Sequence, residues 1–132
     1  MKQGKTFADL AVGMQVAIQN TVSEQDVIDF ARVSGDYNPL HADPEVATTA
    51  GFKAPILHGL CSLGVAGHAI LKTACDYDPA RLASLKLRFS SPVYPGETIR
   101  TEMWIDGKNV SFRARVVERD VVVLNNGLVT IA

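Results

Sequence analysis

Apolar and polar positions alternate along residues 14–22, and a period of two is typical of a half-buried strand. After Ser23 the period changes, and apolar residues recur with helical spacing as far as Gly35. Ser23 is a predicted N-cap, and Asp26 places a negative charge three positions later, where it suits a helix N-terminus. Gly35 is the predicted C-terminal stop. The pattern predicts a strand followed by a short helix.

Residues 35–55 break both periods, because they are rich in Gly, Pro, Asp, Asn and Thr. Pro44–Ala50 within them is predicted to form a helical turn or two. Leu57–Ala74 is almost free of charge and predicts a central helix, buried against a sheet and apolar nearly all round. Inside a helix each glycine costs about 1 kcal/mol relative to Ala. Close packing is therefore expected to compensate for three glycines: Gly59, Gly64 and Gly67.

Four further stretches have strand character, separated by the turn signals YPGE, DGKN and ERD. They are Leu82–Val93, Thr98–Ile105, Val110–Val117 and Val121–Ile131. Asp106-Gly107 is the sharpest hairpin signal among them. The order of elements predicts an α+β fold in a single domain over residues 1–132, an antiparallel sheet wrapped around a long central helix. That arrangement is a single hot-dog fold.

Length and composition agree with one soluble domain. The 132 residues are enough for one hydrophobic core. A formal net charge of −1, with 47% hydrophobic and 20% charged residues, indicates neither disorder nor a nucleic acid partner. No stretch approaches the roughly 18 apolar residues of a membrane span, so no membrane association is expected.

Three further features bear on location. The opening MKQGKTFADL has no continuous apolar core of the secretory kind. Cys61 and Cys75 lack the spacing of a metal ribbon or redox pair, which predicts free thiols in a reducing compartment. The final LVTIA is not a Ser-Lys-Leu peroxisomal address, so the cytoplasm is the expected location.

The loop SGDYNPLH, residues 34–41, gathers three polar groups in an otherwise apolar chain: Asp36, Asn38 and His41. Pro39 restrains itself and Asn38 toward an extended or turn conformation, so the three side chains can surround one small pocket. A carboxylate and an imidazole are suited to moving protons near neutral pH, and an amide can orient a water. The alternative is that Asp36 and Asn38 only make Asx turns while His41 lies on the surface. Local spacing does not decide between the two.

Gly59 falls near the start of the predicted central helix, where unpaired N–H groups and the helix dipole can stabilise a carbonyl oxygen that gains negative charge. The alternative is a packing glycine. His58 is interpreted as an orienting, hydrogen-bonded residue rather than a second base, and His68 as structural.

The run FARVSGDYNPLHADPEVATTAGF, together with APILHGLCSLG, resembles the MaoC-like, (R)-specific 2-enoyl-CoA hydratase family. The family motif has an aromatic and a small residue, then Gly-Asp-x-Asn-Pro-apolar-His, followed by a Gly at a helix start. The later FSSPVYPGETIRTEMW is similar to the hydratase domain of peroxisomal multifunctional enzymes. The resemblance implies a hot-dog fold and hydration of trans-2-enoyl-CoA to (R)-3-hydroxyacyl-CoA.

The resemblance also assigns roles by residue. Asp36 and His41 would be the acid/base pair, Asn38 would help hold the water, and the Gly59 amide would form the oxyanion hole. No metal and no separate cofactor are expected, since coenzyme A is part of the acyl-CoA substrate. A homodimer is expected, with the acyl pocket near its interface.

Lys86 and Arg88 alternate with apolar residues in LKLRFSSP, so they are expected to face away from the core. There they either bind coenzyme A phosphates or are simply solvated. Three alternatives to the leading function stay open: hydration of another unsaturated thioester (branched, dicarboxylic or carrier-bound), a hot-dog thioesterase, and a non-catalytic acyl-CoA-binding subunit.

Overall fold

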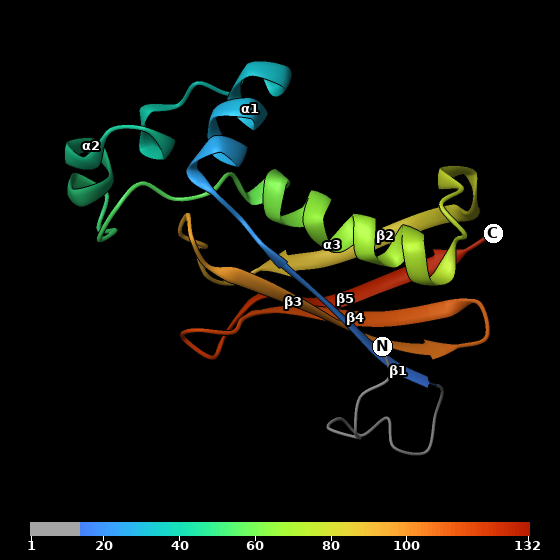
Figure 1. The fold of residues 1–132 in the computed structure, drawn as a ribbon. Coiled ribbons are helices and arrows are strands. Elements are labelled where there is room, and N and C mark those ends of the chain that lie inside the picture. Colours follow the sequence, from blue (N-terminus) through green and yellow to red (C-terminus); the bar gives the residue numbers. More distant parts are fainter. Residues whose placement is uncertain (1–13) are drawn as a thin grey trace.

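The computed structural model describes residues 14–132 (Figure 1). In chain order its strands and α-helices are β1 Met14–Thr21, α1 Glu24–Ser34, α2 Pro44–Thr49, α3 Gly59–Ala74, β2 Leu82–Phe89, β3 Thr98–Asp106, β4 Asn109–Val116 and β5 Val121–Ile131. Two short 3-10 turns, Pro39–His41 and Pro79–Arg81, precede α2 and β2.

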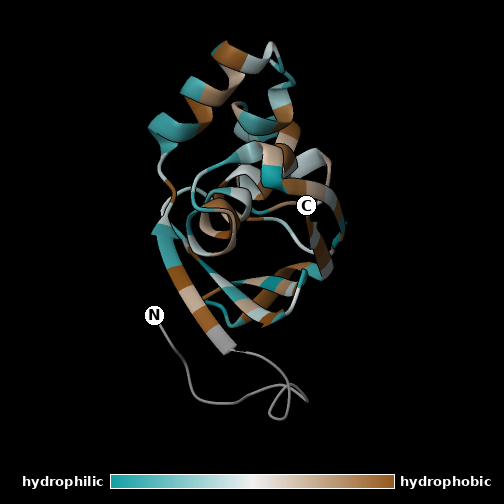
Figure 2. Cartoon of the chain, turned by 90° about the vertical axis from the view of Figure 1, so that its right-hand side faces the viewer, coloured by the Kyte–Doolittle hydropathy of each residue, from teal (hydrophilic) through white to brown (hydrophobic). Residues whose placement is uncertain are grey.

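The strands form one antiparallel sheet in the order β1-β3-β4-β5-β2. β3, β4 and β5 make the expected meander, while β1 and β2 form the two edges. The view in Figure 2 looks along α3 and shows the sheet curving around this helix. The predicted hot-dog fold is confirmed. At the β3–β4 hairpin Asp106 pairs with Asn109, so the loop is Gly107 and Lys108, with φ of 59° at the glycine.

The ends of α1 follow from local chemistry, as expected. The Ser23 hydroxyl accepts from Asp26 N–H at 3.2 Å, and the Asp26 carboxylate accepts from Ser23 N–H at 2.8 Å. This capping box satisfies two donors that the helix itself leaves unpaired. Gly35 ends the helix with φ of 78°, a left-handed conformation that costs glycine little, and its N–H donates to the Ala31 carbonyl. The polar loop therefore starts directly at the helix end.

The long helix α3 packs one face on the sheet through Ser62, Ala66, Ala69 and Ile70. The predicted burial against the sheet is confirmed on this face, whereas on the other side Leu60 is 64% exposed, because no described element covers that side. A Cβ added at Gly64 or Gly67 would meet no atom within 4 Å. The close packing expected at these two glycines is therefore absent within residues 14–132.

The connection between β2 and β3 departs from the predicted pattern. β2 ends at Phe89 rather than Val93, because the chain leaves the sheet before Pro92, which has no N–H for a ladder. The following loop lies beside the end of β1, where Gly96 N–H donates to the Val22 carbonyl at 2.7 Å. This bond holds the loop between β2 and β3 close to the segment that joins β1 to α1.

Residues 24–56 stand away from the sheet as an overhang that carries α1 and α2 (Figure 1). The chain rejoins the body of the fold at Leu57, whose N–H donates to the Val93 carbonyl at 2.8 Å. No helix within residues 14–132 has the length and apolar character needed to cross a bilayer.

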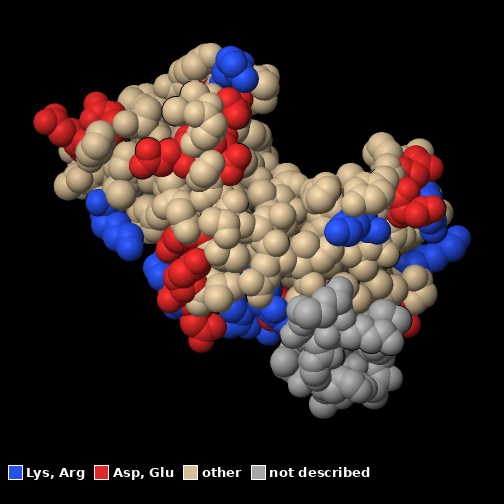
Figure 3. Space-filling model, in the orientation of Figure 1, with Lys and Arg blue, Asp and Glu red and all other residues tan. Residues whose placement is uncertain are grey.

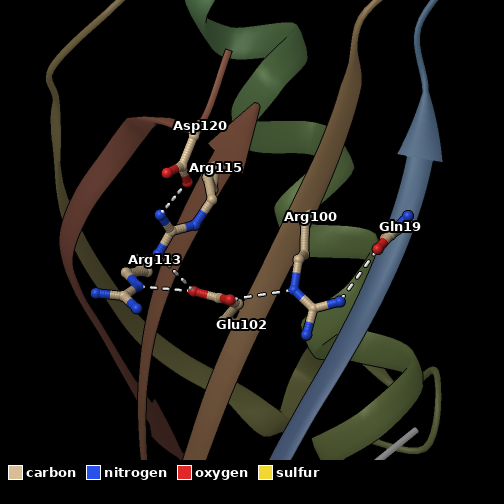
Figure 4. Close-up of polar contacts among 6 residues, drawn as sticks. All are labelled: Gln19, Arg100, Glu102, Arg113, Arg115 and Asp120. Carbon is tan, nitrogen blue, oxygen red and sulfur yellow. Dashed lines mark hydrogen bonds and ion pairs between the residues drawn. The ribbon is translucent and has the colours of Figure 1, made fainter. Parts of the chain in front are cut away.

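A carboxylate surrounded by guanidinium groups lies on the face of the sheet away from α3 (Figure 4). Glu102 on β3 accepts from Arg113 at 2.7 Å and from Arg100 at 3.1 Å, and Arg115 lies 3.6 Å away. Burial acts to raise the pKa of Glu102, but the hydrogen bonds and charges of the arginines outweigh it and lower that pKa. We call these four residues the Glu102 cluster.

Candidate active site

The polar loop after α1 is built from two Asx turns. The Asn38 N–H donates to Asp36 Oδ1 at 3.2 Å, and the Leu40 N–H donates to Asn38 Oδ1 at 3.0 Å. The turns predicted by the structural alternative are therefore present. They use only one carboxylate oxygen of Asp36 and the carbonyl oxygen of Asn38. Asp36 Oδ2 and the NH2 group of Asn38 are left without a hydrogen-bond partner among residues 14–132.

His41 points inward rather than lying on the surface, because its side chain is 12% exposed. Its Nδ1 lies 2.7 Å from the Ile56 carbonyl oxygen. A carbonyl can only accept, so Nδ1 carries the hydrogen and Nε2 of the neutral ring keeps its lone pair. Nε2 lies 3.9 Å from Asp36 Oδ2, beyond direct hydrogen-bond distance. The geometry leaves two acceptors facing each other.

His58 lies behind this pair and is 2% exposed. Its Nε2 is 3.0 Å from the backbone carbonyl oxygen of Asp36, as expected for a hydrogen-bonded residue. Its ring stacks on the ring of His41, with centroids 3.8 Å apart, and Phe30 of α1 packs at 4.8 Å. Two rings from outside the polar loop, those of Phe30 and His58, therefore pack behind it.

Gly59 is the first residue of α3, directly after His58. No acceptor within residues 14–132 binds its N–H, as is usual for the first turn of a helix. A Cβ at this position would lie 3.2 Å from Cε1 of Phe89, so the packing interpretation also holds here. The two interpretations of Gly59 are compatible: its N–H is free to bind an oxygen, and its lack of a side chain leaves room for the ring of Phe89.

A pocket of about 820 Å³ opens beside the polar loop, and Asp36, Asn38 and His41 line it together. The three predicted residues therefore do surround one pocket. Its other walls are largely apolar and come from α1, from the segment before α3 and from the loop after β2; they include Val27, Ile28, Ala31, Pro55, Tyr94 and Pro95. Gly59 is not among the lining residues.

Tyr94 on the loop after β2 is held by charged side chains. Lys53 lies 4.7 Å and the Arg119 guanidinium 5.2 Å from its ring centre. Arg119 also binds Glu97 and the Pro92 carbonyl. Burial acts to raise the pKa of Glu97, but the bonds from Arg119 and from the Tyr94 N–H outweigh it and lower that pKa. This wall of the pocket is thereby fixed to the sheet.

The structure places Lys86 and Arg88 outside the pocket. Both are exposed on β2, while the alternating Leu85 and Leu87 pack against the core. The residues that sequence reasoning missed are Tyr94, which lay in a segment read only as a turn, and Lys53. Their distance from residues 36–41 along the chain left no local signal.

Asp36, His41 and His58 bring one potential metal-ligating atom each within 4.8 Å of the others. One nitrogen of each ring is already bound to a carbonyl, by Ile56 for His41 and by Asp36 for His58. Each neutral ring therefore keeps one nitrogen with a lone pair, Nε2 in His41 and Nδ1 in His58.

The fold and the loop define the chain as a hot-dog domain with a carboxylate and an imidazole facing each other at a pocket. The family model described as MaoC like domain matches residues 9–127, and the chain belongs to this family. The resemblance stated from the sequence is confirmed.

Known relatives cover most of this chain. Peroxisomal enoyl-CoA hydratase 2 of Arabidopsis thaliana is 54% identical over 93 residues, which are 70% of this chain and 30% of that protein. The full-length peroxisomal multifunctional enzyme type 2 of Drosophila melanogaster superposes with a TM-score of 0.84 at 44% identity, over 89% of this chain and 22% of that one. The chain therefore spans less than a third of either protein.

A third relative is closer in length. The R-hydratase PhaJ1 of Pseudomonas aeruginosa superposes with a TM-score of 0.78 at 29% identity, covering 91% of this chain and 79% of that one. A protein with nearly the same extent as this chain thus shares its fold.

Proposed function

We propose that this chain catalyses the hydration of trans-2-enoyl-CoA to (R)-3-hydroxyacyl-CoA and the reverse dehydration. The observation that carries the proposal is the pair Asp36 Oδ2 and His41 Nε2, 3.9 Å apart at the wall of an apolar pocket. Membership of the MaoC-like family supports the substrate class, because relatives are named enoyl-CoA hydratase 2 and R-hydratase. The (R) configuration rests on the second of these names.

Water fits between the two acceptors. With His41 neutral, Nε2 and Oδ2 can each accept one of the two hydrogens of the same water. A water oxygen about 2.8 Å from both atoms would see them about 90° apart, given their separation of 3.9 Å, close to the angle within water itself. Asn38 lines the same pocket, and its free NH2 group can donate to the water oxygen.

The addition balances without any other reactant. The water oxygen bonds to C3 of the enoyl thioester, one water proton passes to Asp36 or His41, and C2 takes a proton from the same pair. Electron density moves onto the thioester oxygen during the attack. The free N–H of Gly59, at the positive end of α3, is the proposed donor to that oxygen. Either member of the pair can take the first proton, since each presents an acceptor atom to the proposed water.

The proposed acyl site is the apolar pocket next to the pair. Its volume of about 820 Å³ lies within the range of roughly 300–1,000 Å³ for small-molecule sites. Lys86 and Arg88 are the proposed partners of the coenzyme A phosphates. Both are exposed on β2, and neither side chain has an ion pair within residues 14–132.

We propose a homodimer as the active assembly. The observation that favours it is the uncovered side of α3, where Leu60 is exposed and a Cβ added at Gly64 or Gly67 would meet no described atom within 4 Å. Figure 3 shows this region as a hollow between the overhang and the far end of α3, with few charged residues on its surface. β2 is also a free sheet edge beside it, and such edges are usually paired or protected. A surface with an exposed leucine and few charges is suited to a second copy.

The proposed reaction needs no metal and no cofactor, since proton transfer and one hydrogen-bond donor suffice for addition of water. Turnover is accordingly expected to be unchanged after treatment with a chelator. We also keep the cytoplasm as the proposed location; two relatives named above are called peroxisomal, and imaging of the protein in its own cells would distinguish the compartments.

The test mixes the purified protein with crotonyl-CoA and follows loss of the conjugated thioester absorbance, with the configuration of the product assigned. Asp36→Asn and His41→Ala are measured alongside. Formation of (R)-3-hydroxybutyryl-CoA by the wild type, lost in both folded variants, is the expected result.

Other outcomes select among the alternatives. Hydration only of a branched, dicarboxylic or carrier-bound thioester would change the substrate and keep the site. Release of free thiol from saturated acyl-CoA would identify a thioesterase, and binding without turnover a non-catalytic subunit. Full activity in both variants would contradict the proposed pair.

A further inference from the structure

The first half of the polar loop, residues 36–38, is tied to distant parts of the described fold by a single side chain. Within residues 14–132, the other hydrogen bonds of Asp36–Asn38 are local and span two or three residues. The exception joins the Asp36 carbonyl oxygen to Nε2 of His58, 22 positions along the chain, at 3.0 Å. The position of the Asp36 backbone relative to the body of the protein therefore depends on His58.

The tautomer of His58 follows from this bond. Because the Asp36 carbonyl can only accept, Nε2 carries the hydrogen, and Nδ1 of the neutral ring keeps a lone pair. Nδ1 is buried and has no hydrogen-bond partner within residues 14–132. A ring nitrogen enclosed in this way has no route to substrate, so His58 is unsuited to be a second base and suited to hold something else.

The same ring also limits the movement of His41. The two imidazoles stack at 3.8 Å with 24° between their planes, and Phe30 packs at 4.8 Å from His58. The Ile56 carbonyl fixes the Nδ1 edge of His41. One bond at the edge would still let the His41 ring rock about it, and the stacked ring of His58 opposes that motion.

We propose that His58 is a positioning residue that holds both members of the Asp36–His41 pair: Asp36 by a hydrogen bond to its backbone carbonyl, and His41 by ring stacking. The inference rests on the proposed hydratase function for its kinetic meaning. The two contacts use different properties of one side chain, a donor and a flat ring, and can therefore be removed separately.

The experiment uses a matched set of substitutions at this position. His58→Gln keeps an N–H donor close to the position of Nε2 and removes the ring. His58→Phe keeps a flat ring and removes the donor, and His58→Ala removes both. Lys108→Gln is the control, because Lys108 is an exposed residue of the β3–β4 hairpin and is not among the residues that line the pocket.

Initial rates are measured with crotonyl-CoA well below the lowest melting temperature of the set. Because misplacing reacting groups by about 1 Å can cost on the order of 100-fold, we expect His58→Ala to lower kcat by roughly that factor. The Gln and Phe variants are expected to lose less, each retaining one contact, with KM within about threefold of the wild type and the control unchanged. A purely structural role would not divide kcat from KM in this way.

A second arm does not depend on turnover. Long-range nitrogen NMR of the three histidines is expected to show His58 as the Nε2–H tautomer and His41 as the Nδ1–H tautomer, with the His41 signals shifted in His58→Gln. A Nδ1–H tautomer for His58 would remove the bond to Asp36 and overturn the proposal.

The two arms separate the possible failures. A wild type that hydrates crotonyl-CoA while all folded His58 variants keep the same kcat would refute positioning and leave the hydratase proposal intact. A rise in KM with unchanged kcat would assign His58 to substrate binding instead. A wild type that hydrates no thioester, with the expected tautomers present, would refute the proposed function but not the contacts of His58 with Asp36 and His41.

Discussion

Two carboxylates in this protein stand in opposite surroundings. The Glu102 side chain is 7% exposed and meets three arginines, whereas the Asp36 side chain is 49% exposed and has Nε2 of His41 at 3.9 Å. The oxygens of Glu102 are occupied, and its arginines lower its pKa. One oxygen of Asp36 makes only a turn within its own loop. A carboxylate surrounded by fixed cations contributes to stability, and a carboxylate left with a free oxygen beside an imidazole is available for proton transfer.

The sharpest way to break this comparison is to neutralise Asp36. Asp36→Asn keeps the shape and the Asx turn but removes the carboxylate of the proposed pair, so hydration of crotonyl-CoA is expected to fall by about 10³-fold, within the usual range of general acid–base catalysis. The melting temperature is expected to change little, since the side chain is half exposed. Asp106→Asn in the β3–β4 hairpin is the matched control. Equal losses in both variants would show that the effect is not specific to the site.

The opposite result is expected at Glu102. Glu102→Gln removes the carboxylate that three guanidinium groups share, which should lower the free energy of unfolding by roughly 1–3 kcal/mol, the range for losing a buried charged partner. The arginines are partly exposed, so water offsets some of the loss. Activity per folded molecule should stay the same. Denaturant unfolding, with exposed Glu45→Gln as the control, measures the difference; a loss of kcat at full folding would contradict the structural assignment.

Lowering the pH should test the stabilising role of the paired glutamates, with a smaller effect on the free energy of unfolding. Glu97 and Glu102 have pKa values lowered by their arginines, so they stabilise the fold at neutral pH, where both are ionised in the folded and unfolded states. That contribution is lost as pH falls below the ordinary glutamate value of about 4.3 and through the lower folded values. The free energy of unfolding, measured from pH 7 to pH 3, should therefore decline, and less steeply in Glu102→Gln. Parallel curves for the two proteins would argue against the lowered pKa of Glu102.

The smallest expected effect is at the exposed cations of β2. Lys86→Gln with Arg88→Gln should raise KM for crotonyl-CoA by a few-fold and leave kcat unchanged, because exposed ion pairs contribute only about 0–1 kcal/mol. The effect should shrink at high salt. Steady-state kinetics at two ionic strengths provide the measurement. No change in KM at low salt would return both residues to the solvated alternative.

Much of the fold could be predicted from short-range patterns. The bounds of β5, Val121–Ile131, agree with the alternation in the sequence. The capping box at Ser23 and the stop at Gly35 agree as well. Each of these features depends on residues a few positions apart, so the information needed to predict it is present in one short window.

In the candidate site, too, the features that depend on neighbouring residues could be predicted from the sequence. The sequence by itself determined which groups could move protons, because Asp36, Asn38 and His41 lie within six residues of one another and Pro39 turns the chain between them. Whether Asx turns or a pocket would result was open, and the structure contains both.

Only the tertiary structure decided how those groups are held and what surrounds them. The Ile56 carbonyl that orients His41 and the His58 bond to Asp36 span 15 and 22 positions. Tyr94, which also lines the pocket, comes from the loop between β2 and β3, more than 50 positions after His41. A backbone carbonyl looks the same in every sequence, and a long-range contact depends on how separate elements pack. The exposure of α3 has the same cause: its apolar pattern specified a helix, but which of its sides is covered depends on what lies against it.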